Sequence, residues 1–302
     1  MNKVIMTLGV LLFFVLMLQM PSGAAAFNHK NKMGQTGGAG FKKNKEQKNQ
    51  STTNGLTKKN KPLIDQVKGA FMARRANLVD MKARGFMETG LRPVYPTGLN
   101  CQIADSLFAS GTRGNGTQRS NMFFQGYHGG MDIPGKGIDI LAMADGEVIA
   151  KNIGDNIGGI KIVLRHSPQN TGLNVWAFTE YKHMKEPSDR PLNSIVRMGD
   201  VLGVAWNTGT TGGKAYGISG NYGLHVSTWY NDTGDYKSTP RLLIPKQGFW
   251  MDPLAMLRGL PVNSEDVKNL NDDQKQFPLS YKTADGNIVP ENAKVIWPFA
   301  CI

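Results

Sequence analysis

A chain of 302 residues, of which 40% are hydrophobic, is long enough to bury the core of one large domain or two small ones. The formal net charge is +12, and nine lysines against a single glutamate between residues 27 and 62 supply most of it. Because the basic side chains are concentrated in one segment, the charge argues against a globular surface that binds nucleic acid.

Residues 1–26 have the pattern of a secretory signal peptide. Lys3 provides the positive start, residues 4–20 are almost entirely apolar, and residues 24–26 are alanines of the kind that a signal peptidase needs. We expect cleavage before Phe27. The alternative is an uncleaved membrane anchor, but the apolar run is short for a helix that spans a membrane. The sequence therefore predicts an exported protein of the periplasm, cell envelope or extracellular space, without a transmembrane domain after cleavage.

Residues 27–62 are rich in Asn, Gly, Lys, Gln and Thr and contain few apolar side chains. A segment of this composition buries too little apolar surface to fold, so we predict a disordered basic linker. Its lysines either keep the linker solvated or draw it to an anionic envelope surface, such as cell-wall polymer or lipid headgroups.

Residues 63–92 are predicted to be a helical segment. The apolar side chains between residues 63 and 79 partly follow helical spacing, and Gly85 is a plausible end of the helix. Two positions are open for this helix, one on the globular domain and one on a membrane surface.

The pattern changes near residue 92, where Gly and Pro recur and helical spacing disappears. We predict an all-β domain over residues 93–259, predominantly antiparallel because no βαβ alternation is present. Residues 260–302 form a predicted polar extension with an apolar end that packs back on the domain. Six runs have the composition of strands: Ile138–Ala142, Gly146–Lys151, Lys161–His166, Ala177–His183, Asp200–Ala205 and Leu224–Tyr230. A short helix is expected after Pro253.

Two cysteines, Cys101 and Cys301, are present in the whole chain. In an exported protein such a pair is a candidate disulfide, which would close a loop of about 200 residues and stabilise the fold by about 4–5 kcal/mol. The alternative is that both thiols are free and buried.

His128 and Asp132 are two metal-binding side chains separated by Gly129, Gly130 and Met131. In a regular strand they would lie roughly 13 Å apart, too far for one ion, and the glycines disfavour a helix. A tight turn brings them together, because glycine accepts backbone angles that other residues avoid. A tetrahedral zinc ion would then need one further protein ligand and an open position, which is the pattern of catalytic sites.

The order of segments around this motif carries a family resemblance. Residues 100–258 contain, in succession, the segments 128–134, 137–148, 162–166, 181–184, 196–203 and 223–226. This succession resembles the lysostaphin/LytM-type zinc endopeptidases, which cut peptide cross-links in bacterial cell walls. The resemblance implies a zinc-dependent metalloendopeptidase that hydrolyses peptide bonds in peptidoglycan.

The resemblance also assigns roles to single residues. It implies that His128, Asp132 and His225 bind one Zn²⁺ per chain. His183 matches the catalytic histidine of a Y-x-H segment. In this alignment of residues 223–227 with the family motif, Ser227 has no part in metal binding. An alternative alignment would place Ser227 in the ligand position and leave the metal with two protein ligands. His166 has no counterpart and is expected to be an ordinary residue at a strand end.

One position departs from the family pattern. Gly223 stands where the family has a second catalytic histidine, and the neighbouring Tyr222 is a conceivable substitute as a hydrogen-bond donor. The departure supports an alternative function, a catalytically impaired LytM-like domain that binds wall peptides or activates another cell-wall hydrolase. The variant Gly223→His is expected to distinguish the enzyme from the binding module, since it would restore the missing side chain.

Overall fold

The computed structural model describes residues 63–302 except for 156–157, 212–213, 216–221 and 239–242. The expected signal peptide at 1–26 and the expected basic linker at 27–62 lie outside the described residues. Within the described part, no helix has the length and apolar character that crossing a membrane requires.

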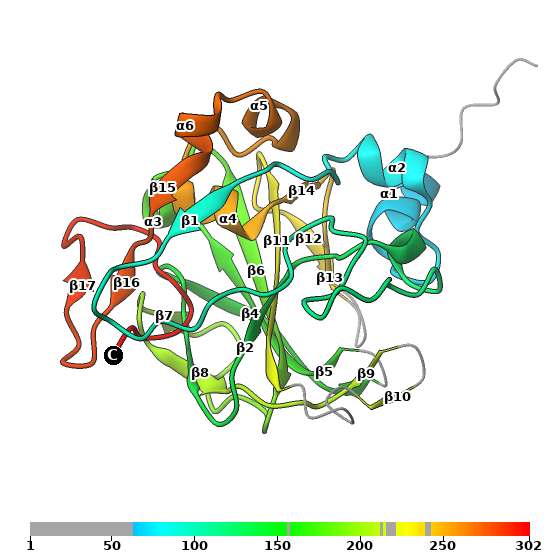
Figure 1. Cartoon of the computed structure of the whole chain (residues 1–302). Helices are drawn as coiled ribbons and strands as arrows, with labels where there is room; N and C mark the ends of the chain where they lie inside the picture. Colours follow the sequence, from blue (N-terminus) through cyan, green and yellow to red (C-terminus); the bar gives the residue numbers. More distant parts are fainter. Residues whose placement is uncertain (1–62, 156–157, 212–213, 216–221, 239–242) are drawn as a thin grey trace, which may run out of the picture. The chain divides into compact units, whose positions relative to one another are not determined.

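The centre of the fold is a seven-stranded sheet with the order β14-β11-β6-β5-β4-β7, to which β2 adds by pairing with β11 (Figure 1). All pairs in this sheet are antiparallel, which confirms the predicted all-β, predominantly antiparallel class. Its strands are β2 (Met131–Pro134), β4 (Gly146–Asp155), β5 (Gly159–His166), β6 (Trp176–Met184), β7 (Ile195–Val196), β11 (Gly223–Asn231) and β14 (Phe249–Met251).

Shorter elements surround the sheet. The remaining strands are β1 (Arg92–Val94), β3 (Asp139–Leu141), β8 (Val201–Val204), β9 (Thr210–Thr211), β10 (Lys214–Ala215), β12 (Tyr236–Ser238), β13 (Leu243–Pro245), β15 (Gln276–Pro278), β16 (Tyr281–Lys282) and β17 (Ile288–Val289). The helices are α1 (Leu63–Phe71), α2 (Leu78–Lys82), η1 (Phe124–Gly126), α3 (Pro168–Thr171), α4 (Pro253–Arg258), α5 (Ser264–Lys268) and α6 (Asp272–Lys275). All six predicted strands and the helix after Pro253 are confirmed. The sequence did not predict β2, η1, α3 or any element after residue 260, and it also did not predict the short strands β1, β7, β9, β10, β12, β13 and β14.

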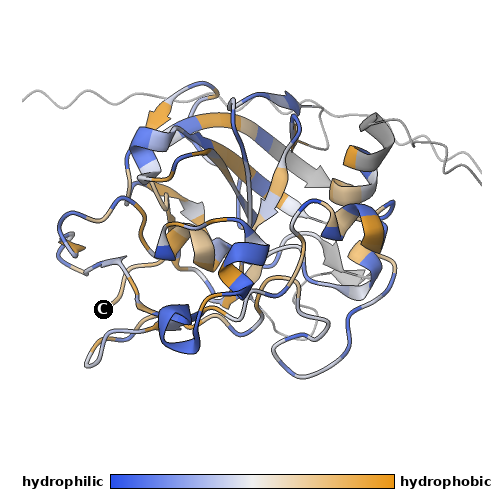
Figure 2. Ribbon diagram, turned by 90° about the horizontal axis from the view of Figure 1, so that it is seen from above, coloured by the Kyte–Doolittle hydropathy of each residue, from blue (hydrophilic) through white to orange (hydrophobic). Residues whose placement is uncertain are grey.

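Strand β11 shows how the sheet separates two environments. Leu224 and Val226 contribute to the larger apolar cluster on one face, whereas Trp229 belongs to the second cluster on the other face. Because side chains alternate along a strand, His225 and Ser227 lie on the same face as Trp229. Figure 2 shows strongly apolar ribbon along the strands of the sheet and hydrophilic ribbon in many of the connecting loops. His225 and Ser227 are therefore buried polar residues on a sheet that also buries Lys161, Thr179 and Glu180 of the neighbouring strands.

The segment predicted as one helix over residues 63–85 contains two, α1 and α2. The break has a local cause, since the side chain of Asn77 accepts a hydrogen bond from the Asp80 amide and starts a new helix. The Trp250 indole donates to the Ala70 carbonyl at 3.0 Å, and its ring stacks on Phe71. The segment thus packs on the β domain, one of the two positions that the sequence left open.

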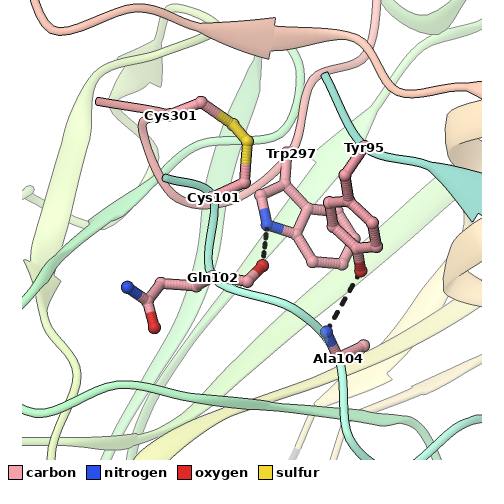
Figure 3. The surroundings of a disulfide bond; sticks show 6 residues. All are labelled: Tyr95, Cys101, Gln102, Ala104, Trp297 and Cys301. Carbon is pink, nitrogen blue, oxygen red and sulfur yellow. Dashed lines mark hydrogen bonds between the residues drawn. A yellow bond between two sulfur atoms is a disulfide. The ribbon is translucent and has the colours of Figure 1, made fainter. Parts of the chain in front are cut away.

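Cys101 and Cys301 form a disulfide bond (Figure 3), so the alternative of two free thiols is wrong. The neighbouring contacts hold the same two segments together: the Trp297 indole donates to the Gln102 carbonyl at 2.9 Å, and its ring meets the edge of Tyr95. Residues 295–297 are buried, which confirms that the apolar end of the chain packs back on the domain.

The double variant Cys101→Ser/Cys301→Ser is expected to lose about 4–5 kcal/mol of the free energy of unfolding, because a loop of 200 residues is no longer closed in the unfolded chain. Urea titration of the variant and of the oxidised wild-type protein measures the difference. The reduced wild-type protein is the control and should unfold with the variant. Equal midpoints for the oxidised protein and the variant would contradict the prediction.

Candidate metal centre

His128 and Asp132 lie on either side of a bend at Gly129 and Gly130 that leads into β2. The bend brings His128 Nε2 within 3.1 Å of Asp132 Oδ1, as the sequence predicted. The expected reason was wrong, because neither glycine has a left-handed φ. A Cβ at Gly130 would lie 2.2 Å from the Val226 carbonyl oxygen, so glycine is required by the close approach of the bend to β11.

His225 completes the cluster from β11, where it stands directly opposite Asp132 of β2. Its Nδ1 lies 2.8 Å from Asp132 Oδ1 and 3.1 Å from His128 Nε2. The three atoms form a nearly equilateral triangle. Within the described part of the chain, these three residues are placed so that they could hold one metal ion together. The structure therefore brings together the three residues that the sequence analysis selected, and the β2–β11 pairing is what positions them.

The dimensions and chemistry of the triangle suit a small cation. Tetrahedral zinc with bonds of about 2.0–2.1 Å has ligand atoms about 3.3 Å apart, close to the separations of 2.8–3.1 Å in this cluster. The His128 Nδ1–H donates to the Leu107 carbonyl at 3.0 Å, so Nε2 presents a lone pair to the centre. Two imidazoles and one carboxylate are a donor set that zinc accepts, with a fourth position left for solvent or substrate.

Arg119 supports the carboxylate of this cluster, although no sequence motif marked it. Its Nη2 lies 3.2 Å from Asp132 Oδ2, the oxygen that does not face His128 and His225. Burial raises the pKa of Asp132, but the imidazoles, His128 first, outweigh burial and hold that pKa well below its usual range. The Asp132 carboxylate is therefore ionised, and Arg119 holds its orientation.

Ser227 is a hydrogen-bond partner of His225, although it is not one of the three residues that form the triangle. Its Oγ lies 3.0 Å from His225 Nε2 and can accept the Nε2 proton when Nδ1 faces a metal ion. Burial lowers the pKa of His225 to about 3, so the ring is neutral at neutral pH and available as a ligand. His225 occupies the triangle, and Ser227 lies behind it rather than in its place.

Ser227→Ala is expected to weaken zinc binding about tenfold, because outer partners of metal-bound histidines typically contribute 10–100-fold to affinity. Competition with a chromogenic chelator measures the change. Thr228→Val is a matched control, since it removes the neighbouring hydroxyl, which donates instead to the Met251 carbonyl. Identical affinities for Ser227→Ala and wild type would show that the hydrogen bond does not orient the ring.

His183 reaches the same neighbourhood through an irregularity in β6. The pairing with β5 passes from Lys182 to Met184 and leaves His183 as the extra residue of a β-bulge, with a φ of 66°. Regular alternation would place His183 on the face of Tyr181; instead, its ring centroid lies 6.0 Å from that of His225. The bulge thus turns His183 toward the triangle of His128, Asp132 and His225, at the cost of a strained backbone.

The protonation state of His183 follows from its surroundings. Burial lowers its pKa to about 4, and its Nδ1–H donates to the Thr208 carbonyl at 2.7 Å. The ring is therefore neutral at neutral pH, with Nε2 as its acceptor atom. His166, by contrast, is fully buried between the Asp145 carbonyl and the Thr179 hydroxyl, and it acts as a packing residue of the sheet.

Gly223 is a closely packed position rather than an open one. A Cβ there would lie 2.7 Å from the Ile133 carbonyl oxygen of β2, so the backbone leaves no room for a histidine. Gly223→His therefore perturbs packing and cannot serve as the expected test of a missing catalytic side chain. Tyr222 packs its ring on Trp206 and beneath the Lys136 ammonium.

Gly223→Ala is expected to lower the free energy of unfolding by about 1–3 kcal/mol, since β2 and β11 must separate to admit the methyl group. Gly111→Ala is the matched control, because a Cβ at Gly111 would meet no neighbouring atom. Urea titration of both variants checks the prediction. A Gly223→Ala protein as stable as the Gly111→Ala protein would show that β2 yields readily at this point.

No protein-family model and no curated protein matches the chain. Lysostaphin/LytM-type peptidases recur among similar solved structures. Lysostaphin from Staphylococcus simulans is 16% identical, with 53% of this chain and 55% of that chain covered and a TM-score of 0.31. A zinc-containing peptidase from Vibrio cholerae is 18% identical (46% and 36% covered, TM-score 0.31). The catalytic domain of the prophage-encoded M23 protein EnpA from Enterococcus faecalis is 17% identical (50% and 96% covered, TM-score 0.29).

The chain spans about half the length of the lysostaphin structure and about a third of the Vibrio cholerae peptidase. TM-scores of 0.29–0.31 at identities of 16–18% are too low to carry an argument about function. The function is therefore inferred from the side chains of the site and from the motifs of the sequence.

Proposed function

We propose that the chain is a zinc-dependent metalloendopeptidase that hydrolyses peptide bonds in bacterial cell-wall peptidoglycan. The observation that carries the proposal is the triangle of His128 Nε2, Asp132 Oδ1 and His225 Nδ1, with separations of 2.8–3.1 Å. A second histidine, His183, stands beside it on a strained bulge. The order of motifs along residues 100–258 supports peptidoglycan as the substrate class.

When bound, zinc supplies Lewis-acid polarisation of a peptide carbonyl and activation of water. His128, Asp132 and His225 hold the ion, and Arg119 and Ser227 orient two of these ligands. His183 is neutral at neutral pH, so its ring can exchange a proton with the reacting peptide or hydrogen-bond to it. The Thr208 carbonyl fixes Nδ1 as the protonated nitrogen of that ring.

The enzyme is tested on purified cell-wall sacculi. The zinc-loaded protein is expected to release soluble peptides from sacculi, to stop when a chelator removes the ion, and to recover when zinc is returned. A protein that binds one zinc ion and releases no peptides would contradict the enzymatic proposal.

A second function is favoured by one observation, the tight packing at Gly223 where the resembled family has a histidine. In this alternative the domain keeps the metal, binds wall peptides, and activates another cell-wall hydrolase without cleaving bonds itself. Co-sedimentation distinguishes the two functions. A binding module pellets with sacculi and releases nothing alone, yet increases release when a separate hydrolase is present.

Export and envelope contact belong to the same proposal. The apolar run at residues 4–20 supports secretion into the periplasm, cell envelope or medium, and the lysines of residues 27–62 support attraction to an anionic envelope surface. N-terminal sequencing of the protein from a cell-envelope fraction tests the first point, since a mature start at Phe27 is expected.

A further inference from the structure

Three charged residues lie on strands β5 and β6 beside the metal cluster and have no role in the mechanism above. Glu180 accepts from the Lys161 ammonium at Oε1 and from the Lys182 ammonium at Oε2, both at 2.8 Å. Burial alone would raise the pKa of Glu180, but Lys161 and then Lys182 lower it to about 2, so the carboxylate is ionised. One buried carboxylate therefore anchors two ammonium groups.

The register places this group of three next to the metal cluster. Lys182 stands directly opposite His225 across the β6–β11 pair, and Glu180 stands opposite Ser227. Side chains opposite one another in a ladder share a face, so Lys182 and His225 project from the same side of the sheet. The contact is continuous: the Lys182 ammonium lies 3.5 Å from Ser227 Oγ, which in turn contacts His225.

Lys182 differs from its two partners in exposure. Its side chain is 18% exposed, against 5% for Lys161 and 6% for Glu180. Asp132, the most accessible ligand of the metal cluster, is also 18% exposed. Lys182 is thus the most accessible member of the group, and the buried Glu180 carboxylate holds its ammonium in place.

The charge of Lys182 is felt at the site. Its ammonium lies 3.5 Å from Ser227 Oγ, and Ser227 Oγ lies 3.0 Å from His225 Nε2, so the positive charge is close to the His225 ring. Arg119 contributes a second positive charge on the far side of Asp132. Arg119 is paired with the Asp132 carboxylate, whereas two ammonium groups share the single carboxylate of Glu180, so the group of Lys161, Glu180 and Lys182 keeps a positive charge that favours an anionic ligand.

We propose that Lys182 is a carboxylate-binding subsite that selects peptides with a negative charge close to the bond that is cleaved. The inference rests on the proposed function, because it assumes that a peptide occupies the metal centre. An ammonium with one strong partner, a long contact to Ser227 and partial access to solvent can donate a further charge-assisted hydrogen bond. Burying a lysine side chain costs free energy unless its ammonium is paired with a carboxylate. Glu180 provides that carboxylate, and the Lys182 side chain still remains 18% exposed.

The test uses two forms of one probe and measures binding rather than turnover. Wall peptides made soluble by a muramidase are compared, by calorimetry, with the same peptides after amidation of their carboxylates. The protein is zinc-loaded and carries His183→Ala to prevent cleavage. We expect the carboxylate form to bind about tenfold more tightly than the amidated form, as for one charge-assisted hydrogen bond.

Adding Lys182→Met is expected to remove this preference and to leave the zinc stoichiometry and the affinity for the amidated peptides unchanged. If the Lys182→Met protein does not fold, Lys182→Gln is used in its place. Lys182→Arg should keep the preference for the carboxylate form. Lys185→Met is the matched control, an exposed lysine nearby that should have no effect. A preference that survives Lys182→Met, or equal binding of both peptide forms, overturns the subsite and leaves the proposed function standing. If neither form binds, the proposed function itself is overturned.

Discussion

His225→Ala is expected to lower zinc affinity by more than about 100-fold, and His128→Ala and Asp132→Ala should do the same. The physical reason is that a site with three protein ligands has none to spare, whereas the loss of an outer partner alone already costs about 10–100-fold. In His225→Ala the loss also leaves the Asp132 carboxylate without the imidazole that lies 2.8 Å away. Competition with a chelator of known affinity gives the three constants.

His166→Asn provides the control for these ligand variants. His166 is a buried histidine whose contacts are to the Asp145 carbonyl and the Thr179 hydroxyl. Its replacement should affect stability and leave the zinc affinity of the folded protein unchanged. The assignment of the ligands would be contradicted if zinc binding survived His225→Ala but was lost in the folded His166→Asn protein.

His183→Ala is expected to reduce peptide release from sacculi by about 10²–10⁴-fold, the usual contribution of a general acid–base group. The ring is neutral, held at Nδ1 by the Thr208 carbonyl, and placed 6.0 Å from the His225 ring by the bulge in β6. Since His183 is not part of the triangle, zinc stoichiometry should stay at the wild-type value. Release rates and zinc content are measured on the same preparation.

Lys185→Met is a suitable comparison for His183→Ala, because Lys185 follows β6 and its side chain is half exposed. Its rate of release should match that of the wild-type protein. A His183→Ala protein that kept both its zinc and its full rate would exclude His183 from the chemistry and would favour a role for the bulge in packing alone.

The main strands were predictable because their apolar side chains dominate the local pattern. Leu224 and Val226 alternate with polar residues, and all six predicted runs became strands. β2 was missed because Met131–Pro134 is short, begins at the bend and ends in proline. Its pairing with β11 nevertheless positions the candidate centre, so the motif at His128 indicated which residues mattered without showing how they meet.

The surroundings of the site depend on strand register and could not be read from the sequence. Arg119 reaches Asp132 from a loop that precedes the motif, and Lys182 meets His225 only because β6 and β11 pair at that register. The bulge at His183 reverses the side that alternation predicts. Gly223 looked like a missing histidine, whereas its glycine is explained by the carbonyl of Ile133.

Zinc stoichiometry tests the central claim most directly. The mature chain is stripped with a chelator, reloaded with zinc, freed of excess ion, and analysed for metal per polypeptide beside the triple variant His128→Ala/Asp132→Ala/His225→Ala. We predict one zinc ion per wild-type chain and none held by the folded triple variant. A wild-type chain that retains no more zinc than the triple variant would contradict the metal centre and the function proposed from it.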